Sequence, residues 1–243
     1  MAQLPIGFAH RGARSQAPDN TLRAFRLALA LGAAGLESDA WITAEGVVVL
    51  DHDGVVGPPW RRRPIAQIRR DSLPPHIPAL RDLYRECGTA FELSLDLKDP
   101  RTAAAIVDTA AAADPGAVSR LWLCHPDPVV LGEFSAAGPG VRLVHSTSLR
   151  RLASGADAED RLALLAAVAA EDRRGGLHAI NLRADEWNEP LVAAVHREGL
   201  LAFGWDAQRI GTLERLLSAG IDAVYCDHVP RMLDALSRHR RAG

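Results

Sequence analysis

Four segments near the start of the chain carry most of its information: FAHRG (residues 8–12), PDNT (18–21), GLESD (35–39) and VVVLDHD (47–53). The first and last contain apolar runs that end in charged or polar residues. Such runs are too short for helices and are typical of buried strands that deliver polar side chains at their ends. These residues therefore predict a site built where strands end.

The segment GLESD places two carboxylates on one strand face. Glu37 and Asp39 are two residues apart, and alternate side chains of a strand point the same way. They would lie about 7 Å apart along the strand and repel each other unless a cation compensates. A divalent ion does this best, although Arg11 and Lys98 could instead pair with the carboxylates without a metal.

Beyond these segments, short apolar runs alternate with amphipathic ones along the whole chain. The predicted strands are 6–9, 35–43, 91–97, 121–124, 141–145, 178–182, 200–205 and 223–226, with a further short strand at 47–50. The predicted helices are 22–29, 79–87, 102–113, 127–136, 158–173, 189–198, 212–219 and 231–240. Strands that alternate with helices form parallel sheets, and eight such pairs in about 240 residues favour a closed barrel. We expect an α/β fold, a single (β/α)8 TIM barrel over residues 1–243.

Active sites of such barrels lie at the C-terminal ends of the strands. In the third strand, residues at even positions would face inward, so Asp96 and Lys98 would reach the exit. Glu92 would lie about 13 Å behind Asp96 and could not share an ion with it. The residues that strand ends would deliver are His10, Glu37, Asp39, Asp96, Lys98, His125, His145, Asn181, Trp205 and Asp227.

Composition narrows the classes of function. The 243 residues are 48% hydrophobic, which supports one large core, and the net charge of −2 gives no electrostatic reason to expect a nucleic-acid partner. No apolar run approaches the length of a membrane span, and residues 1–5 do not resemble an export signal. We therefore expect a cytoplasmic protein without stable membrane insertion. Its oligomeric state stays open.

The order and spacing of these segments resemble the signature of the glycerophosphodiester phosphodiesterase family, whose usual form is H-R-G, P-E-N-T, E-x-D, T-x-D-G and H-D. The corresponding residues here are His10-Arg11-Gly12, Pro18-Asp19-Asn20-Thr21, Glu37-Ser38-Asp39, Thr43-Ala44-Glu45-Gly46 and His52-Asp53. Residues 77–80 and 220–227 resemble later motifs of the family, so the likeness extends along the chain.

The resemblance implies metal-dependent hydrolysis of a small glycerophosphodiester to glycerol 3-phosphate and an alcohol, a reaction of lipid and glycerol metabolism. The family's route uses a neighbouring glycerol hydroxyl as the internal nucleophile. Oxygen ligands suit Ca²⁺ or Mg²⁺ and argue against zinc. The implied roles are His10 and His52 as acid and base, Glu37, Asp39 and Asp96 as metal ligands, and Arg11, Lys98 and Trp205 as substrate contacts.

Other functions stand as alternatives, and two residues depart from the family's pattern. Asp19 and Asp96 stand where the family usually has Glu, and each is one methylene shorter. One alternative is a lysophospholipase D-like activity on lipid phosphodiesters, with residues 55–60 as an apolar entrance. Another is a barrel that binds a phosphoester without turnover. The arginines at 61–63 are either solvated or in contact with a lipid surface.

Overall fold

The computed structural model describes residues 4–134, 140–152, 155 and 157–242. Within them, eight parallel strands close into a barrel, because β1 pairs with both β11 and β2. The barrel strands are β1 (Ile6–Ala9), β2 (Gly35–Ile42), β6 (Glu92–Leu97), β7 (Leu121–His125), β8 (Arg142–Ser146), β9 (Ala179–Arg183), β10 (Leu201–Trp205) and β11 (Ala223–Cys226). The predicted TIM barrel is confirmed.

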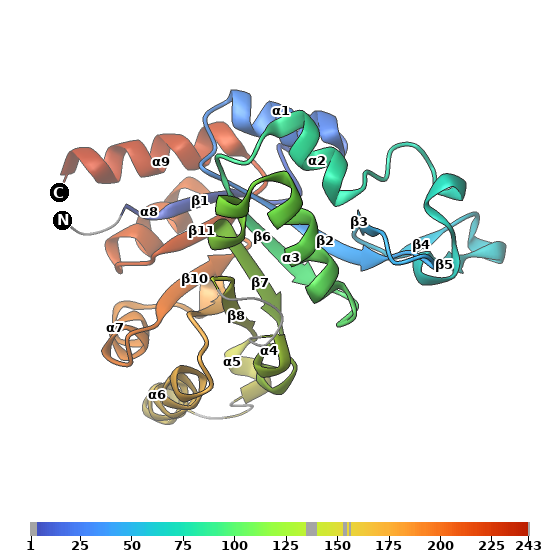
Figure 1. The fold of residues 1–243 in the computed structure, drawn as a ribbon. Helices are drawn as coiled ribbons and strands as arrows, with labels where there is room; N and C mark the ends of the chain where they lie inside the picture. Colours follow the sequence, from blue (N-terminus) through green and yellow to red (C-terminus); the bar gives the residue numbers. More distant parts are fainter. Residues whose placement is uncertain (1–3, 135–139, 153–154, 156, 243) are drawn as a thin grey trace.

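Helices lie between successive strands and cover the outside of the barrel (Figure 1). They are α1 (Leu22–Ala30), α2 (Leu80–Cys87), α3 (Thr102–Ala113), α4 (Pro128–Phe134), α5 (Leu149–Leu152), α6 (Ala158–Arg174), α7 (Glu189–Arg197), α8 (Ile210–Ser218) and α9 (Val229–Ala242). Thr21 caps α1, since its hydroxyl accepts a hydrogen bond from the Ala24 amide. Residues 135–136 of the predicted fourth helix lie outside the described residues, and the single turn α5 was not predicted.

One long excursion separates β2 from α2. After β3 (Val48–Leu50), which runs antiparallel to β2, the chain forms the hairpin β4 (Val55–Val56) and β5 (Arg63–Pro64). Short 3₁₀ turns accompany it at η1 (Pro59–Arg61), η2 (Ile65–Gln67) and η3 (Arg70–Ser72), and others occur at η4 (Pro115–Arg120) and η6 (Ala184–Glu186). Figure 1 shows the hairpin projecting beyond the arrowhead of β2.

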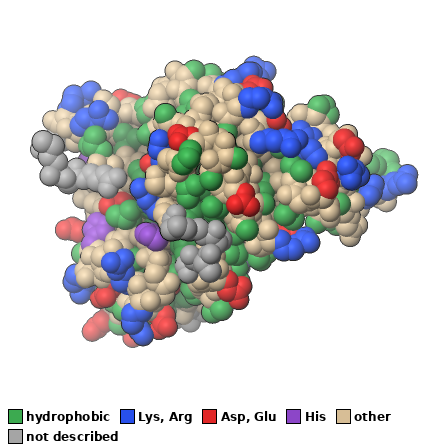
Figure 2. All heavy atoms as spheres, viewed as in Figure 1, with side chains coloured by type: hydrophobic (Ala, Val, Ile, Leu, Met, Phe, Trp, Pro, Cys, Tyr) green, Lys and Arg blue, Asp and Glu red, His purple; other side chains and the backbone are tan. Residues whose placement is uncertain are grey.

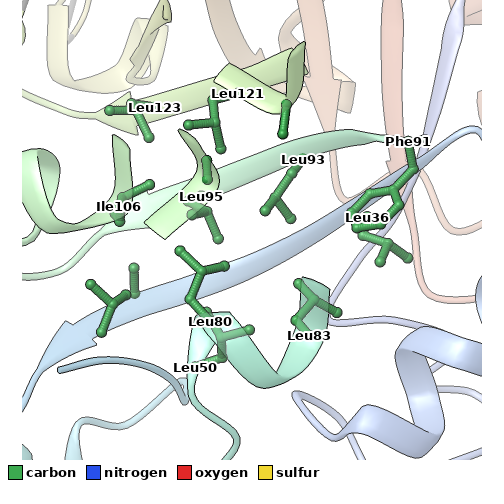
Figure 3. Close-up of a cluster of buried hydrophobic side chains, with 14 of the residues drawn as sticks. Leu36, Leu50, Leu80, Leu83, Phe91, Leu93, Leu95, Ile106, Leu121 and Leu123 are labelled. Carbon is green, nitrogen blue, oxygen red and sulfur yellow. The ribbon is translucent and has the colours of Figure 1, made fainter. Parts of the chain in front are cut away.

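The apolar side chains form two layers. Leu93 and Leu95 of β6 face outward and pack with Leu80 and Leu83 of α2 and with Ile106 of α3 (Figure 3). This is the arrangement that alternation in the third strand predicted. The burial of this outer layer removes apolar surface from water along the whole strand–helix interface and is the main source of the fold's stability.

A second layer fills the inside of the barrel with aromatic rings. The ring of Phe8 stacks on Tyr225 at 4.9 Å between centroids, and Trp122 lies 5.0 Å from Phe203. Glu92 lies beside this layer, accepting hydrogen bonds from Trp122 Nε1 at 2.6 Å and Arg142 Nη1 at 3.2 Å. The layer fills the barrel interior with packed rings.

No helix in the described part of the chain is long and apolar enough to cross a membrane.

The interior aromatic layer predicts a large cost for its removal. Phe203 is fully buried, so Phe203→Ala should lower the free energy of unfolding by about 3–5 kcal/mol. Val129→Ala on α4 is the control, because Val129 is 71% exposed and should change stability by less than about 0.5 kcal/mol. Urea denaturation of both variants measures this, and equal stabilities would contradict the described interior.

Candidate active site

A cavity of about 420 Å³ opens at the C-terminal ends of the barrel strands. Its walls contain seven of the eight residues that the sequence predicts for the site, all except His52. The lining residues are His10, Arg11, Glu37, Asp39, Ser94, Asp96, Lys98, Cys124, Ser146, Asn181, Trp205, Asp206 and Tyr225.

Strand register brings the acidic residues together. In the parallel pair β2–β6, Asp39 lies opposite Asp96 and Glu37 lies opposite Ser94. Neighbouring strands are about 4.8 Å apart, so the Asp39 and Asp96 side chains emerge side by side from adjacent strands. Glu37 lies two residues before Asp39 in β2, on the same face and deeper in the barrel. Three carboxylates therefore share one wall of the cavity.

Two cations compensate these carboxylates. The Lys98 ammonium lies 3.2 Å from Asp39 Oδ1 and 2.5 Å from Asp96 Oδ2. Arg11 Nε lies 3.4 Å from Asp39 Oδ2, the other oxygen of that carboxylate. Burial opposes the charge of Lys98, but the charges of Asp96 and Asp39 outweigh it and raise the pKa of this ammonium. Both groups that would contact a phosphoryl oxygen thus lie against the acidic wall.

Glu37 is the most deeply placed of the three carboxylates. It accepts a hydrogen bond from the Arg11 amide at 2.9 Å, and His10 Nε2 lies 3.8 Å away. Burial raises the pKa of Glu37 to about 7; the charge of His10 lowers it and that of Asp39 raises it. Burial makes this carboxylate costly to ionise, so a positive charge nearby would stabilise its ionised form.

His10 is held from its other side by Asp227. Its Nδ1 donates a hydrogen bond of 2.6 Å to Asp227 Oδ1, which leaves Nε2 toward Glu37 and the cavity. Burial opposes protonation, but Glu37 and the bond to Asp227 outweigh it and raise the pKa of His10. Asp227 was predicted at the mouth, without this role. Spacing alone could not reveal a contact between residues 217 positions apart.

The loop after β1 is held in an unusual backbone conformation. Arg11 and Asn20 both have positive φ, at 53° and 52°, which non-glycine residues rarely adopt outside functional sites. Gly12 also has positive φ, and a Cβ there would lie 2.7 Å from the Ala24 carbonyl carbon. The H-R-G turn is therefore packed directly on α1.

Asn20 connects this loop to the acidic wall. Its side chain accepts a hydrogen bond from Ser38 Oγ at 2.7 Å and donates one to Asp39 Oδ2 at 3.3 Å. Its backbone amide donates to the Arg11 carbonyl at 3.1 Å. From the sequence, Asn20 belongs to the P-D-N-T segment, and no contact with the acidic wall was expected for it. The signal that was missed is the tolerance of asparagine for positive φ.

The floor of the cavity is a small polar network. Ser94 Oγ lies 3.0 Å from the Tyr225 hydroxyl and 3.3 Å from Cys124 Sγ. Burial raises the pKa of the Cys124 thiol to about 12, so this group stays protonated at neutral pH. The floor can offer hydrogen bonds but no reactive thiolate.

The wall opposite the carboxylates has a different chemistry. Asn181 Nδ2 donates to Ser146 Oγ at 3.1 Å, while its buried Oδ1 has no hydrogen-bond partner. Trp205 stands at the rim, 38% exposed, next to Asp206, whose φ is 61°. An indole face and an unpaired carbonyl oxygen fit the carbon skeleton and hydroxyl groups of a polyol.

Three histidines that the sequence places near the mouth do not line the cavity. His52 follows β3 at the rim, where its Nδ1 bonds to Asp53 Oδ1 at 2.8 Å and its side chain is 46% exposed. It does not line the cavity, and its catalytic role stays a prediction. The expectation for His145 is wrong, because this residue is buried with its Nδ1 2.7 Å from Asp172 Oδ2 of α6. His125 is the last residue of β7, and its Nδ1 accepts a hydrogen bond from the Asp127 amide of the following loop.

The donor set fits a hard divalent cation in its chemistry, since Glu37, Asp39 and Asp96 offer only carboxylate oxygens. Their spacing does not complete a metal site. Among the described residues, no three His, Cys, Asp or Glu side chains are positioned together to hold an ion. Lys98 lies between Asp39 and Asp96, so the ion pairs that the sequence left as an alternative are present.

The positive φ of Asn20 gives a testable difference between two variants. Asn20→Gly removes the bonds to Ser38 and Asp39 and should cost about 1–3 kcal/mol. Asn20→Ala removes the same bonds and adds left-handed strain, so it should be less stable than the glycine variant by about 0.5–1 kcal/mol. Urea denaturation compares them, and an alanine variant as stable as the glycine variant would argue against the strained loop.

Part of the sequence is similar to proteins that are already known. Residues 10–83 match the glycerophosphoryl diester phosphodiesterase family. Glycerophosphodiester phosphodiesterase 1 of Bos taurus is 54% identical over 48 residues, which is 20% of this chain and 14% of that protein. The glycerophosphodiester phosphodiesterase of Caldanaerobacter subterraneus is 46% identical over 48 residues, 20% of either chain. The aligned segment is thus a small part of these curated relatives.

Solved structures extend the likeness to the whole fold. A glycerophosphodiester phosphodiesterase of Thermotoga maritima has a TM-score of 0.75 at 19% identity, covering 96% of this chain and 99% of its own. A phosphodiesterase of Oleispira antarctica, solved with the product sn-glycerol-3-phosphate, has a TM-score of 0.78 at 20% identity, covering 96% and 97%. Residues 10–83 are therefore similar to the glycerophosphoryl diester phosphodiesterase family, and the whole chain shares the barrel fold of these solved structures.

Proposed function

We propose that this chain hydrolyses glycerophosphodiesters to glycerol 3-phosphate and an alcohol, and that residues 1–243 act as one catalytic domain. The observation that carries the proposal is a single cavity lined by His10, three carboxylates and two cationic side chains. The family match covers residues 10–83, and these include most of that wall. The product complex of the Oleispira relative supports a small phosphorylated ligand for this fold.

The anionic substrate requires positive charge in the cavity. A phosphodiester resists attack because its own charge repels nucleophiles, and catalysis depends on offsetting that charge as it grows. Arg11 would bind phosphoryl oxygens through its planar fork and Lys98 as a point charge. Both now contact Asp39, so substrate would compete for them with the acidic wall.

The acidic wall would serve a metal ion in this proposal. Glu37, Asp39 and Asp96 would hold Ca²⁺ or Mg²⁺, which supplies a fixed positive charge beside the phosphoryl group. The raised pKa of Glu37, caused first by its burial, supports a need for positive charge there. The shorter side chain of Asp96 leaves room for a longer ligand or for a water.

Proton transfer falls to His10. The bond from Nδ1 to Asp227 fixes the orientation of the ring and leaves Nε2 to exchange a proton in the cavity. His52 is proposed as its partner on the strength of the H-D motif, from its position at the rim. Asn181 and Trp205 would contact the glycerol or alcohol portion.

Replacement of His10 tests the proposal. Hydrolysis of glycerophosphocholine should fall at least about 100-fold in His10→Ala, since loss of an acid or base group costs that much. His239→Ala on α9 is the matched control and should retain full activity. Release of glycerol 3-phosphate is the measurement, with circular dichroism to verify the fold.

Lysophosphatidylcholine, offered in parallel, separates the remaining alternatives. Turnover of the lipid alone would favour the lysophospholipase D-like activity. If the wild type binds sn-glycerol 3-phosphate but hydrolyses neither substrate, the protein is a non-catalytic binding barrel. That result would refute the hydrolase proposal.

The proposed metal gives a separate prediction. EDTA should abolish hydrolysis, and added Ca²⁺ or Mg²⁺ should restore it. Asp96→Asn should raise the ion concentration for half-maximal activity at least about tenfold, whereas Asp96→Glu should leave the site functional. Asp108→Asn on the outside of α3 is the matched control for loss of one charge. Undiminished activity in EDTA would refute the metal requirement.

A further inference from the structure

The hairpin β4–β5 is a small, well-anchored projection. Its base is closed by the hydrogen bond from the Ile65 amide to the Gly54 carbonyl at 2.9 Å. Gly54 has positive φ and lies so close to the Trp41 ring that a Cβ would be 2.2 Å from it. Ile65 and Val49 belong to one buried cluster beneath the hairpin. The projection is therefore held in a defined direction.

The tip of this projection exposes a tryptophan. The Trp60 side chain is 86% exposed, more than any other large hydrophobic side chain in the described part of the chain. It follows Pro58 and Pro59, which restrict the backbone of the tip. Burial of an indole side chain is favourable. An exposed tryptophan at this position therefore indicates that another surface binds over it.

Three arginines follow Trp60 directly. Arg61, Arg62 and Arg63 are all exposed, and none of them forms an ion pair with a carboxylate of the described residues. The nearby Arg69 and Arg70 differ, since each has an acidic partner at 3.7 Å. Figure 2 shows several arginine side chains on this projection, with acidic side chains between some of them. The tip thus combines an uncovered indole with unneutralised positive charge.

We propose that this tip docks peripherally on an anionic phospholipid surface, with Trp60 in the headgroup layer and the three arginines on lipid phosphates. Tryptophan favours the membrane interface, and each arginine near an anionic surface adds to the attraction. A protein partner is less well matched, because protein interfaces use broad apolar patches and this tip offers one ring on a narrow hairpin.

The docking surface lies on the same end of the barrel as the cavity. The Asp51 amide donates to the Asp39 carbonyl at 3.1 Å, and the hairpin strand β4 begins four residues later. A protein docked through Trp60 would hold its cavity near the lipid headgroups. The inference goes beyond the proposed hydrolysis and does not depend on it.

Co-sedimentation with vesicles tests the docking. Vesicles of phosphatidylcholine alone should not bind the protein, and an equimolar mixture with phosphatidylglycerol should bind it, more weakly as salt rises. Trp60→Ala should lower the partition coefficient about tenfold, as expected from burial of roughly 50 Å² of indole. Each change of Arg61 or Arg62 to Gln should lower it about fivefold.

Matched controls locate the surface. Val129→Ala removes another exposed apolar side chain, and Arg240→Gln with Arg241→Gln removes two arginines of α9; both should bind vesicles like wild type. Quenching of fluorescence by brominated lipids should occur in wild type and be lost in Trp60→Phe. Thermal unfolding of each variant verifies the fold.

Two results would overturn the proposal. One is binding to anionic vesicles that is unchanged in Trp60→Ala and in the arginine variants. The other is sedimentation of the wild type as a dimer that Trp60→Ala converts to a monomer, because a second copy would then cover the indole.

Discussion

Asp39 and Asp96 lie opposite each other in parallel strands, and this placement of like charges is the constraint around which the barrel mouth is built. Two adjacent carboxylates with a third one deeper are unfavourable unless cations and hydrogen bonds compensate them. Lys98, Arg11 and Asn20 each contact the Asp39 carboxylate. The unusual backbone of the loop after β1 is the means by which two of these groups reach it.

The rest of the fold supports this wall. The aromatic layer of Phe8, Trp122, Phe203 and Tyr225 fills the barrel interior. Tyr225 belongs to both, because its hydroxyl bonds to Ser94 on the cavity floor. On the far side, Asp227 orients His10 against Glu37. Packing thus brings His10 and the acidic wall to one place.

The barrel could be predicted from sequence because alternation of short apolar runs with helices leaves few topologies. Glu37, Asp39 and Asp96 could be predicted because strand periodicity determines which side chains share a face. The contact between Asp227 and His10 could not, since closure of the barrel rather than local pattern creates it. The burial of His145 against Asp172 also escaped prediction, because β8 runs one residue beyond the predicted strand, to Ser146, and His145 then faces the helix layer. The side-chain position of His52 depends on a loop that no periodicity describes.

Anomalous scattering from a crystal soaked in Mn²⁺ is the sharpest test of the proposal that the acidic wall binds a divalent cation. The predicted result is a peak within about 2.0–2.6 Å of carboxylate oxygens of Glu37, Asp39 and Asp96, with the Lys98 ammonium displaced from between the two aspartates. The absence of a peak, with Lys98 still bridging Asp39 and Asp96, would contradict the claim and leave a wall of ion pairs.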